Sequence, residues 1–212
     1  GLDAIDPKIP VLSEESPPHV MAERLKWQKY WLVDPLDGTK EFVKRNGEFT
    51  VNIALIENHR AVLGAVHAPA LRIDYFGELS SGAWRRQAGE SVQPIQVHLP
   101  ARQTPIVVAS RSHRNSSLEQ LLVRIGRHEA VAMGSSLKIC LIACGQADFY
   151  PRLGPTSEWD TAAAQAVLES AGGHMLDITG GPLRYNKPEL LNPHFLAFGD
   201  DAVDWRGLAD DR

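Results

Sequence analysis

The sequence has little of several features that would assign it to a large functional class. It contains only two cysteines, which is typical of a reducing cytoplasm. It has no block or stripe of Lys and Arg, and its formal net charge is −4, so electrostatics give no support for nucleic-acid binding. It also has no apolar run long enough to form an integral membrane segment.

The two cysteines, Cys140 and Cys144, lie four residues apart and would share one face of a helix. A zinc site would need two more ligands, and no Cys or His follows at a finger-like spacing. We therefore expect two small buried core residues.

The chain has 212 residues, of which 43% are hydrophobic and 23% are charged, an ordinary globular composition. Such a chain can bury a sizeable core as one large domain or two small ones. The pattern predicts a first half of antiparallel strands (1–105), a second half in which helices and strands alternate (106–199), and a polar C-terminal tail (200–212) that frays. The expected strands lie at 11–16, 30–34, 49–57, 61–67, 72–76, 106–110, 130–133, 147–151, 175–178 and 195–198, and the main helices at 117–126, 135–144 and 161–171. The fold class is α+β.

The most informative stretch is the nine-residue run 31–39, in which a hydrophobic strand leads into Asp34-Pro-Leu-Asp37-Gly-Thr. Pro35 has no N–H and a fixed φ, so we expect a turn rather than a helix to place the two carboxylates. Gly38 lets the backbone approach whatever they bind. Two hard oxygen ligands at the end of a strand suit Mg²⁺, which keeps waters and accepts phosphate oxygens. The structural alternative is a turn in which both Asp residues only form the bend.

Two further acidic positions accompany this run. Glu14 and Glu15 follow the short strand near the N-terminus, and Asp160 precedes a helix. By itself Asp160 reads as an N-cap or first-turn residue favoured by the helix dipole. That role is compatible with metal binding, because a carboxylate held at a helix N-terminus is well fixed.

These motifs resemble the inositol monophosphatase superfamily. Its first motif is matched by residues 34–39 with Glu14-Glu15 upstream, and its second by residues 159–163 followed by 169–173. The second motif departs from the family pattern at Ala164, where Gly is common. The resemblance implies a layered α/β sandwich of the inositol monophosphatase and fructose-1,6-bisphosphatase type, with the active site between its halves.

Other segments are similar to the bacterial 3′(2′),5′-bisphosphate nucleotidase branch of this family, namely 40–54, 110–113, 134–138 and 150–152. The resemblance implies a lithium-sensitive phosphatase of sulfur metabolism. It would remove the 3′-phosphate of adenosine 3′,5′-bisphosphate, giving AMP and phosphate. The expected partner is thus a small nucleotide bisphosphate, and the expected location is the cytoplasm, with a peripheral position at the inner membrane as the alternative.

The resemblance also implies roles for individual residues. Two or three Mg²⁺ ions would be held by Glu14, Asp34, the carbonyl of Leu36, Asp37 and Asp160. Two such ions about 4 Å apart clamp the attacking water and the leaving oxygen of an in-line displacement. The expected catalytic residues are Glu14, Thr39 and Asp37, with Glu14 and Thr39 orienting or deprotonating the water.

Substrate contacts are expected from the backbone N–H groups at the end of the motif and from several side chains of the branch-specific segments. They are Gly38, Thr39, His113, Ser135, Lys138, Arg152 and Asp160. The structural alternatives are a solvated helix charge for Lys138 and a surface salt bridge for Arg152.

Members of the family also carry an N-terminal helical pair with an Asp that positions the water-activating Thr. The sequence in hand, beginning at Gly1, does not contain it, so the expected fold lacks these helices. Because a fold starting in mid-domain would expose core surface, we expect the segment to have been removed from this sequence.

Three other functions compete with this interpretation. An aspartyl-phosphate phosphatase needs Asp-x-Asp, and the spacing found here is one residue longer, so this motif does not fit. An aspartic protease needs a second Asp-Thr/Ser-Gly, and the sequence has none. A truncated, inactive phosphate-binding protein stays open. Within the family, inositol phosphate and fructose 1,6-bisphosphate are the competing substrates.

Overall fold

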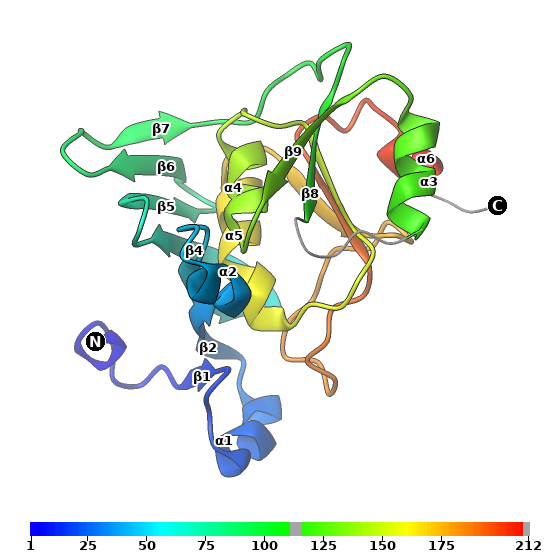
Figure 1. Cartoon of the computed structure of the whole chain (residues 1–212). Coiled ribbons are helices and arrows are strands. Elements are labelled where there is room, and N and C mark those ends of the chain that lie inside the picture. Colours follow the sequence, from blue (N-terminus) through cyan, green and yellow to red (C-terminus); the bar gives the residue numbers. More distant parts are fainter. Residues whose placement is uncertain (111–115, 210–212) are drawn as a thin grey trace.

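The computed structural model describes residues 1–110 and 116–209, and two β-sheets dominate them (Figure 1). The first sheet has seven strands in chain order, β1 (Val11–Ser13), β2 (Lys29–Asp37), β3 (Thr50–Glu57), β4 (Arg60–Ala68), β5 (Ile73–Glu78), β6 (Gly82–Gln87) and β7 (Gln93–Ile95). Its pairs are antiparallel except for β1 and β2, which run parallel.

The second sheet has five strands in the order β11 (His174–Asp177), β12 (Phe195–Phe198), β10 (Phe149–Arg152), β8 (Ile106–Ser110) and β9 (Glu129–Met133). The helices are α1 (Pro18–Glu23), α2 (Thr39–Lys44), α3 (Ser116–Ile125), α4 (Leu137–Ala143), α5 (Glu158–Ser170) and α6 (Trp205–Ala209), with short 3₁₀ turns η1 (Leu2–Ala4) and η2 (Arg24–Lys26). The α+β prediction is confirmed. No helix in the described ranges is long and apolar enough to cross a bilayer.

The elements form layers, with α4 and α5 lying between the two sheets and α3 and α6 on the far side of the second sheet (Figure 1). Helix α5 packs across β3, β4 and β5 on one side and contacts α4 on the other. Its centre is therefore buried all round, and the alanines at 162–164 allow close approach. At Gly64 of β4 a Cβ would lie only 2.1 Å from the carbonyl oxygen of Ala163. Glycine is thus the residue that lets strand and helix meet.

Most predicted elements are present, including the strands β3 and β4, but several details differ. The turn expected at Asp34–Asp37 is instead an irregular end of β2, where the register with β3 shifts between these two residues. Helix α2 follows at once. Helix α5 begins at Glu158, three residues before the predicted start.

Another difference concerns the C-terminus, where a fraying polar tail was predicted. Residues 205–209 form α6 instead, and Trp205 is buried. Its ring stacks on Phe149 of β10 with centroids 4.5 Å apart. One large aromatic side chain in a polar stretch is enough to dock a short helix on the sheet.

The two cysteines behave as expected for core residues. Cys140 is buried in α4, Cys144 is half-buried at its end, and neither forms a disulfide. Burial raises the pKa of both thiols.

Candidate active site

Three carboxylates meet where the first sheet faces the start of α5. Asp34 and Asp37 come from the end of β2, and Asp160 comes from the first turn of α5. One carboxylate oxygen from each lies within 4.8 Å of the others. The predicted association of the two motifs, which are more than a hundred residues apart in sequence, is therefore present.

The local backbone holds the two β2 carboxylates. Asp34 is buried, and its Oδ1 accepts the N–H of Leu36 at 2.9 Å. Asp37 Oδ2 accepts the N–H of Ser136 at 2.6 Å and lies 2.9 Å from the Ser136 hydroxyl. Gly38 has φ of +91°, which lets the chain turn directly from β2 into α2.

Asp160 is held by a capping box at the start of α5. Its Oδ2 accepts the N–H of Ser157 at 2.8 Å, and the Ser157 side chain accepts the N–H of Asp160 in return. One oxygen of Asp160 thus fixes the helix end while the carboxylate still belongs to the acidic cluster. The N-cap and metal-ligand interpretations are compatible in this structure.

The cluster is electrostatically unfavourable without a cation. Burial, and next the charge of Asp37, raise the pKa of Asp34 to about 8 and the pKa of Asp160 to about 7. Three carboxylates that gather so closely, two of them reluctant to ionise, form a set of hard oxygen donors suited to a divalent cation. The residues present therefore fit a metal ion.

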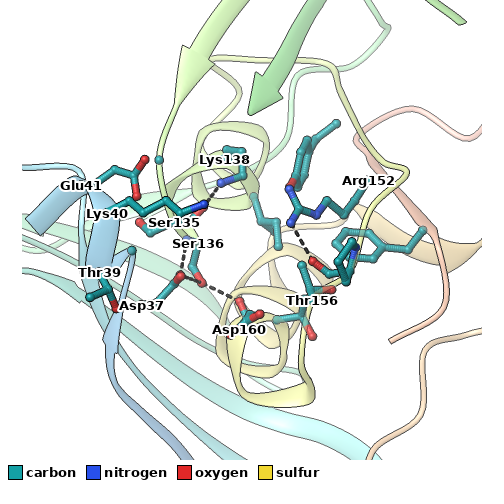
Figure 2. A pocket seen from close by; sticks show the side chains of 17 residues that line it. Asp37, Thr39, Lys40, Glu41, Ser135, Ser136, Lys138, Arg152, Thr156 and Asp160 are labelled. Atoms are coloured by element: carbon teal, nitrogen blue, oxygen red, sulfur yellow. Dashed lines mark hydrogen bonds between the residues drawn. The ribbon is translucent and has the colours of Figure 1, made fainter. Parts of the chain in front are cut away.

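Beside the cluster lies a cavity of about 330 Å³ (Figure 2). Lys138 and Arg152 line it across from Asp37 and Asp160. Lys138 is only 8% exposed, with its Nζ 2.6 Å from the Ser135 carbonyl and 5.6 Å from the centre of the Tyr150 ring. Burial lowers the pKa of Lys138 to about 8. The solvated-charge alternative for Lys138 is wrong.

Arg152 is half-buried in the same wall. Its Nη2 donates to the carbonyl of Pro155 at 2.7 Å, and its Nε is buried with no hydrogen-bond partner within the described ranges. The cavity therefore has the carboxylates of Asp37 and Asp160 on one side and Lys138 and Arg152 on the other, and Lys40 and Glu41 also belong to its lining.

The structure brings together most of the predicted site residues. Those that line the cavity are Asp37, Gly38, Thr39, Ser135, Lys138, Arg152 and Asp160. Asp34 lies in the carboxylate cluster. The carbonyl of Leu36 as a ligand stays a prediction.

Two predicted site residues, Glu14 and His113, are not placed in the cavity or in the carboxylate cluster. Glu14 is exposed and outside the group of three carboxylates, although its charge contributes to the raised pKa of both Asp34 and Asp160. Its metal-ligand role stays a prediction. His113 lies outside the described residues.

Sequence reasoning missed the residues that hold Asp37. Ser136 is 2% exposed, and Asn52 Nδ2 donates to its hydroxyl at 2.9 Å. Thr50 Oγ1 also donates to Asp37 Oδ2, at 3.3 Å. The only available signal was alternation, since Thr50 and Asn52 are polar residues at buried positions of β3. Glu48, whose Oε2 accepts the N–H of Gly134 at 2.8 Å, was missed as well.

The layered fold and the acidic cluster are those of a phosphatase family. The inositol monophosphatase family model matches residues 2–201, and the chain belongs to this family. The predicted resemblance is confirmed.

Individual relatives show which branch of the family the chain is similar to. The chain is 54% identical to a Salmonella typhimurium protein named 3′(2′),5′-bisphosphate nucleotidase CysQ, over 92% of this chain and 78% of the relative. The Escherichia coli K12 protein of the same name is 53% identical over the same shares. A crystal structure of CysQ from Bacteroides thetaiotaomicron, described as a bacterial member of the inositol monophosphatase family, superposes with a TM-score of 0.85. It is 41% identical, with 92% of this chain and 79% of that chain covered.

Proposed function

We propose that the chain is a Mg²⁺-dependent phosphatase that hydrolyses the 3′-phosphate of adenosine 3′,5′-bisphosphate to give AMP and phosphate. The observation that carries the proposal is the cavity with a carboxylate cluster at one end and buried Lys138 with Arg152 at the other. A substrate with two separated phosphates matches this division, because one phosphate faces the metal end and the other faces cations. The names of the relatives at 53–54% identity support the nucleotide.

The chain's own residues define what the site can do. Asp34, Asp37 and Asp160 would hold the metal, with Glu14 and the carbonyl of Leu36 completing two or three ion sites. Bound divalent cations offset charge on the transferring phosphoryl group and make water easier to deprotonate. Ser136 fixes the orientation of Asp37 through two contacts.

Further residues act on the substrate and on the water. Thr39 begins α2 at the edge of the cavity, and the N–H groups of Gly38 and Thr39 are the proposed contacts to oxygens of the reacting phosphate. Glu14 and the Thr39 hydroxyl are the proposed groups that orient the attacking water or take its proton. Ser135, Lys138 and Arg152 would bind the remainder of the nucleotide, with His113 as a further candidate.

Phosphate release with Mg²⁺ tests the proposal. The substrates are adenosine 3′,5′-bisphosphate, inositol 1-phosphate and fructose 1,6-bisphosphate, each measured with and without Li⁺. We expect the highest kcat/KM for the nucleotide, and inhibition by Li⁺. Equal or better turnover of inositol 1-phosphate or fructose 1,6-bisphosphate would reject the nucleotide assignment, and nucleotide binding without phosphate release would indicate an inactive binding protein. A cytoplasmic location is part of the proposal, since low cysteine use is typical of reducing compartments.

A further inference from the structure

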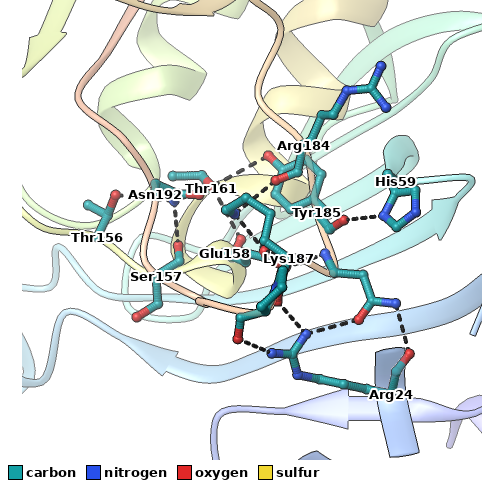
Figure 3. Close-up of polar contacts among 12 residues, drawn as sticks. Arg24, His59, Thr156, Ser157, Glu158, Thr161, Arg184, Tyr185, Lys187 and Asn192 are labelled. Carbon is teal, nitrogen blue, oxygen red and sulfur yellow. Dashed lines mark hydrogen bonds and ion pairs between the residues drawn. The ribbon is translucent and has the colours of Figure 1, made fainter. Parts of the chain in front are cut away.

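The loop at residues 184–192, which we term the brace, lies against the start of α5 (Figure 3). It contacts the α5 N-terminus through both backbone and side chains. The N–H of Glu158 donates to the carbonyl of Leu190 at 2.9 Å, and the N–H of Asn192 donates to the carbonyl of Thr156 at 2.8 Å. The brace is therefore joined to the turn that precedes Asp160.

Asn192 makes the most concentrated contacts of the brace. It is 8% exposed, and its Nδ2 lies 2.7 Å from the Ser157 carbonyl, 3.0 Å from Thr161 Oγ1 and 3.2 Å from Thr156 Oγ1. Thr156 and Thr161 both line the cavity. A single side-chain amide thus connects the residues on either side of Asp160.

Glu158 fixes the same helix end from a second direction. Its carboxylate is fully buried and accepts the N–H of Asn186 at 2.6 Å and the N–H of Lys187 at 3.0 Å. Lys187 Nζ pairs with it at 2.5 Å. A buried carboxylate with a full set of donors rigidifies the segment that carries it.

The brace is also tied to η2, the 3₁₀ turn that precedes β2. Arg24 of η2 donates from Nη1 to Asn186 Oδ1 at 3.0 Å and to the Lys187 carbonyl at 2.7 Å, and from Nη2 to the Pro188 carbonyl at 2.9 Å. The Asn186 amide donates back to the Arg24 carbonyl at 2.8 Å. Because η2 lies between β1 and β2, these bonds tie the brace to the segment that leads into β2, whose opposite end carries Asp34 and Asp37.

We infer that Asn192 is a positioning residue that holds Asp160 against Asp34 and Asp37 at the spacing that divalent cations require, with the brace as its support. The inference rests on the proposed function only in taking the three carboxylates as the metal site. Groups that orient metal ligands typically change metal affinity 10- to 100-fold when they are removed. Asn192 acts on Asp160 only through the backbone and the hydroxyl groups around it. It therefore affects metal binding and does not take part in phosphate hydrolysis.

One observation separates positioning from simple packing. Asn192 Oδ1 is buried and has no hydrogen-bond partner among the residues described. An apolar side chain would avoid this cost of desolvation. Such a replacement would, however, lose the contacts of Asn192 Nδ2 with residues 156–161. These contacts, and not the filling of space, are therefore what the asparagine contributes.

The experiment measures binding of Mn²⁺, as a probe for Mg²⁺, to the purified chain by electron paramagnetic resonance without substrate. We compare wild type, Asn192→Ala and Thr161→Val, which removes one acceptor of the Asn192 amide at nearly constant volume. We expect the Mn²⁺ dissociation constant to rise about 10-fold or more in Asn192→Ala and less in Thr161→Val. The Mg²⁺ concentration that gives half-maximal turnover should rise in parallel, with a smaller change in substrate KM.

Trp205→Phe is the matched control, because it alters the packing of α6 on the face of the second sheet opposite α4 and α5. It should lower Tm without changing the Mn²⁺ dissociation constant. Wild-type Mn²⁺ affinity in folded Asn192→Ala, or in Thr161→Val if the first variant does not fold, would overturn the inference. Failure of the wild type to hydrolyse the nucleotide would reject the proposed function alone, since Mn²⁺ binding is measured without substrate.

Discussion

Asp37 and Ser136 are joined by two contacts, although 99 positions separate them in the chain. Asp37 Oδ2 accepts the Ser136 N–H at 2.6 Å and lies 2.9 Å from the Ser136 hydroxyl. The same hydroxyl lies 2.7 Å from the carbonyl oxygen of Asp160. Ser136 therefore stands between the two motifs that supply the carboxylates and fixes one relative to the other.

Ser136→Ala should weaken the site without unfolding the protein. The N–H contact to Asp37 survives, while the hydroxyl contacts to both motifs are lost. We expect kcat to fall about 10- to 100-fold, the range for loss of a group that orients a metal ligand, and stability to fall by about 1 kcal/mol. Phosphate release and thermal unfolding measure the two effects.

The control is Ser170→Ala, which also removes a buried hydroxyl. Ser170 Oγ is unpartnered in the described part of the chain and lies at the C-terminal end of α5. Its removal should leave both kcat and Tm nearly unchanged. If Ser136→Ala retained wild-type kcat, the orienting role of Ser136 would be wrong.

The acidic cluster predicts how the metal-free protein responds to pH. The folded-state pKa values of Asp34 and Asp160 are raised to about 8 and about 7, so the folded state holds protons that the unfolded state has released above about pH 4. The contribution of these groups to stability therefore falls as pH rises from about 4 to about 8. We expect Tm of the metal-free protein to drop over this range, and the Tm increase caused by Mg²⁺ to grow.

Asp34→Asn isolates this effect. It removes one charge of the cluster and keeps an oxygen that can accept the Leu36 N–H. Without metal, the variant should be more stable than wild type at pH 8 by several degrees and similar at pH 5, in thermal unfolding with a chelator. A constant Tm difference across pH would contradict the assigned cause, which is the ionisation of a buried carboxylate next to Asp37.

The sequence predicts the strands and the acidic motifs because both are local patterns. Alternation marks β3, a run of apolar residues marks β8, and Asp34 and Asp37 are three positions apart. The same patterns miss the end of β2, where strand geometry continues through Pro35 because β3 pairs with it on both sides of the register shift. Tertiary pairing overrides the turn signal there.

The residues that hold the site residues in place are harder to predict from sequence. Ser136, Asn192 and Glu158 act through contacts between segments that meet only after the sheets pack, and no local periodicity reports such contacts. Lys138 was predicted as a substrate contact from a branch-specific segment, but only the position of α4 between the sheets shows that it is buried rather than a solvated helix charge.

Gly64→Ala should be strongly destabilising. The added Cβ would lie 2.1 Å from the Ala163 carbonyl oxygen and 2.8 Å from its carbon, both backbone atoms that cannot rotate away. Strand β4 and helix α5 would have to separate, at a cost of about 1–3 kcal/mol or more, which is several degrees in Tm for a domain of this size. Gly154→Ala is the control, since a Cβ at Gly154 meets no atom within 4 Å. Equal Tm values for the two variants would show that the helix–strand contact is not tight.

Lys138→Met tests which phosphate the cationic end of the cavity binds. The change keeps the length and packing of the side chain and removes its charge, so loss of a charged hydrogen bond of about 1.5–3 kcal/mol should raise KM for adenosine 3′,5′-bisphosphate about 10- to 100-fold. Adenosine 3′-monophosphate, which lacks the second phosphate, should show a much smaller change. Lys29→Met, which removes an exposed lysine paired with Glu57 at 2.6 Å, should affect neither substrate. An equal loss with both nucleotides would place Lys138 at the reacting phosphate instead.

A pH series then tests the charge of Lys138 itself, because the pKa of Lys138 is lowered to about 8 by burial. Wild-type KM for the bisphosphate should therefore rise above pH 8 as the lysine loses its proton, and KM of Lys138→Met should not follow this rise.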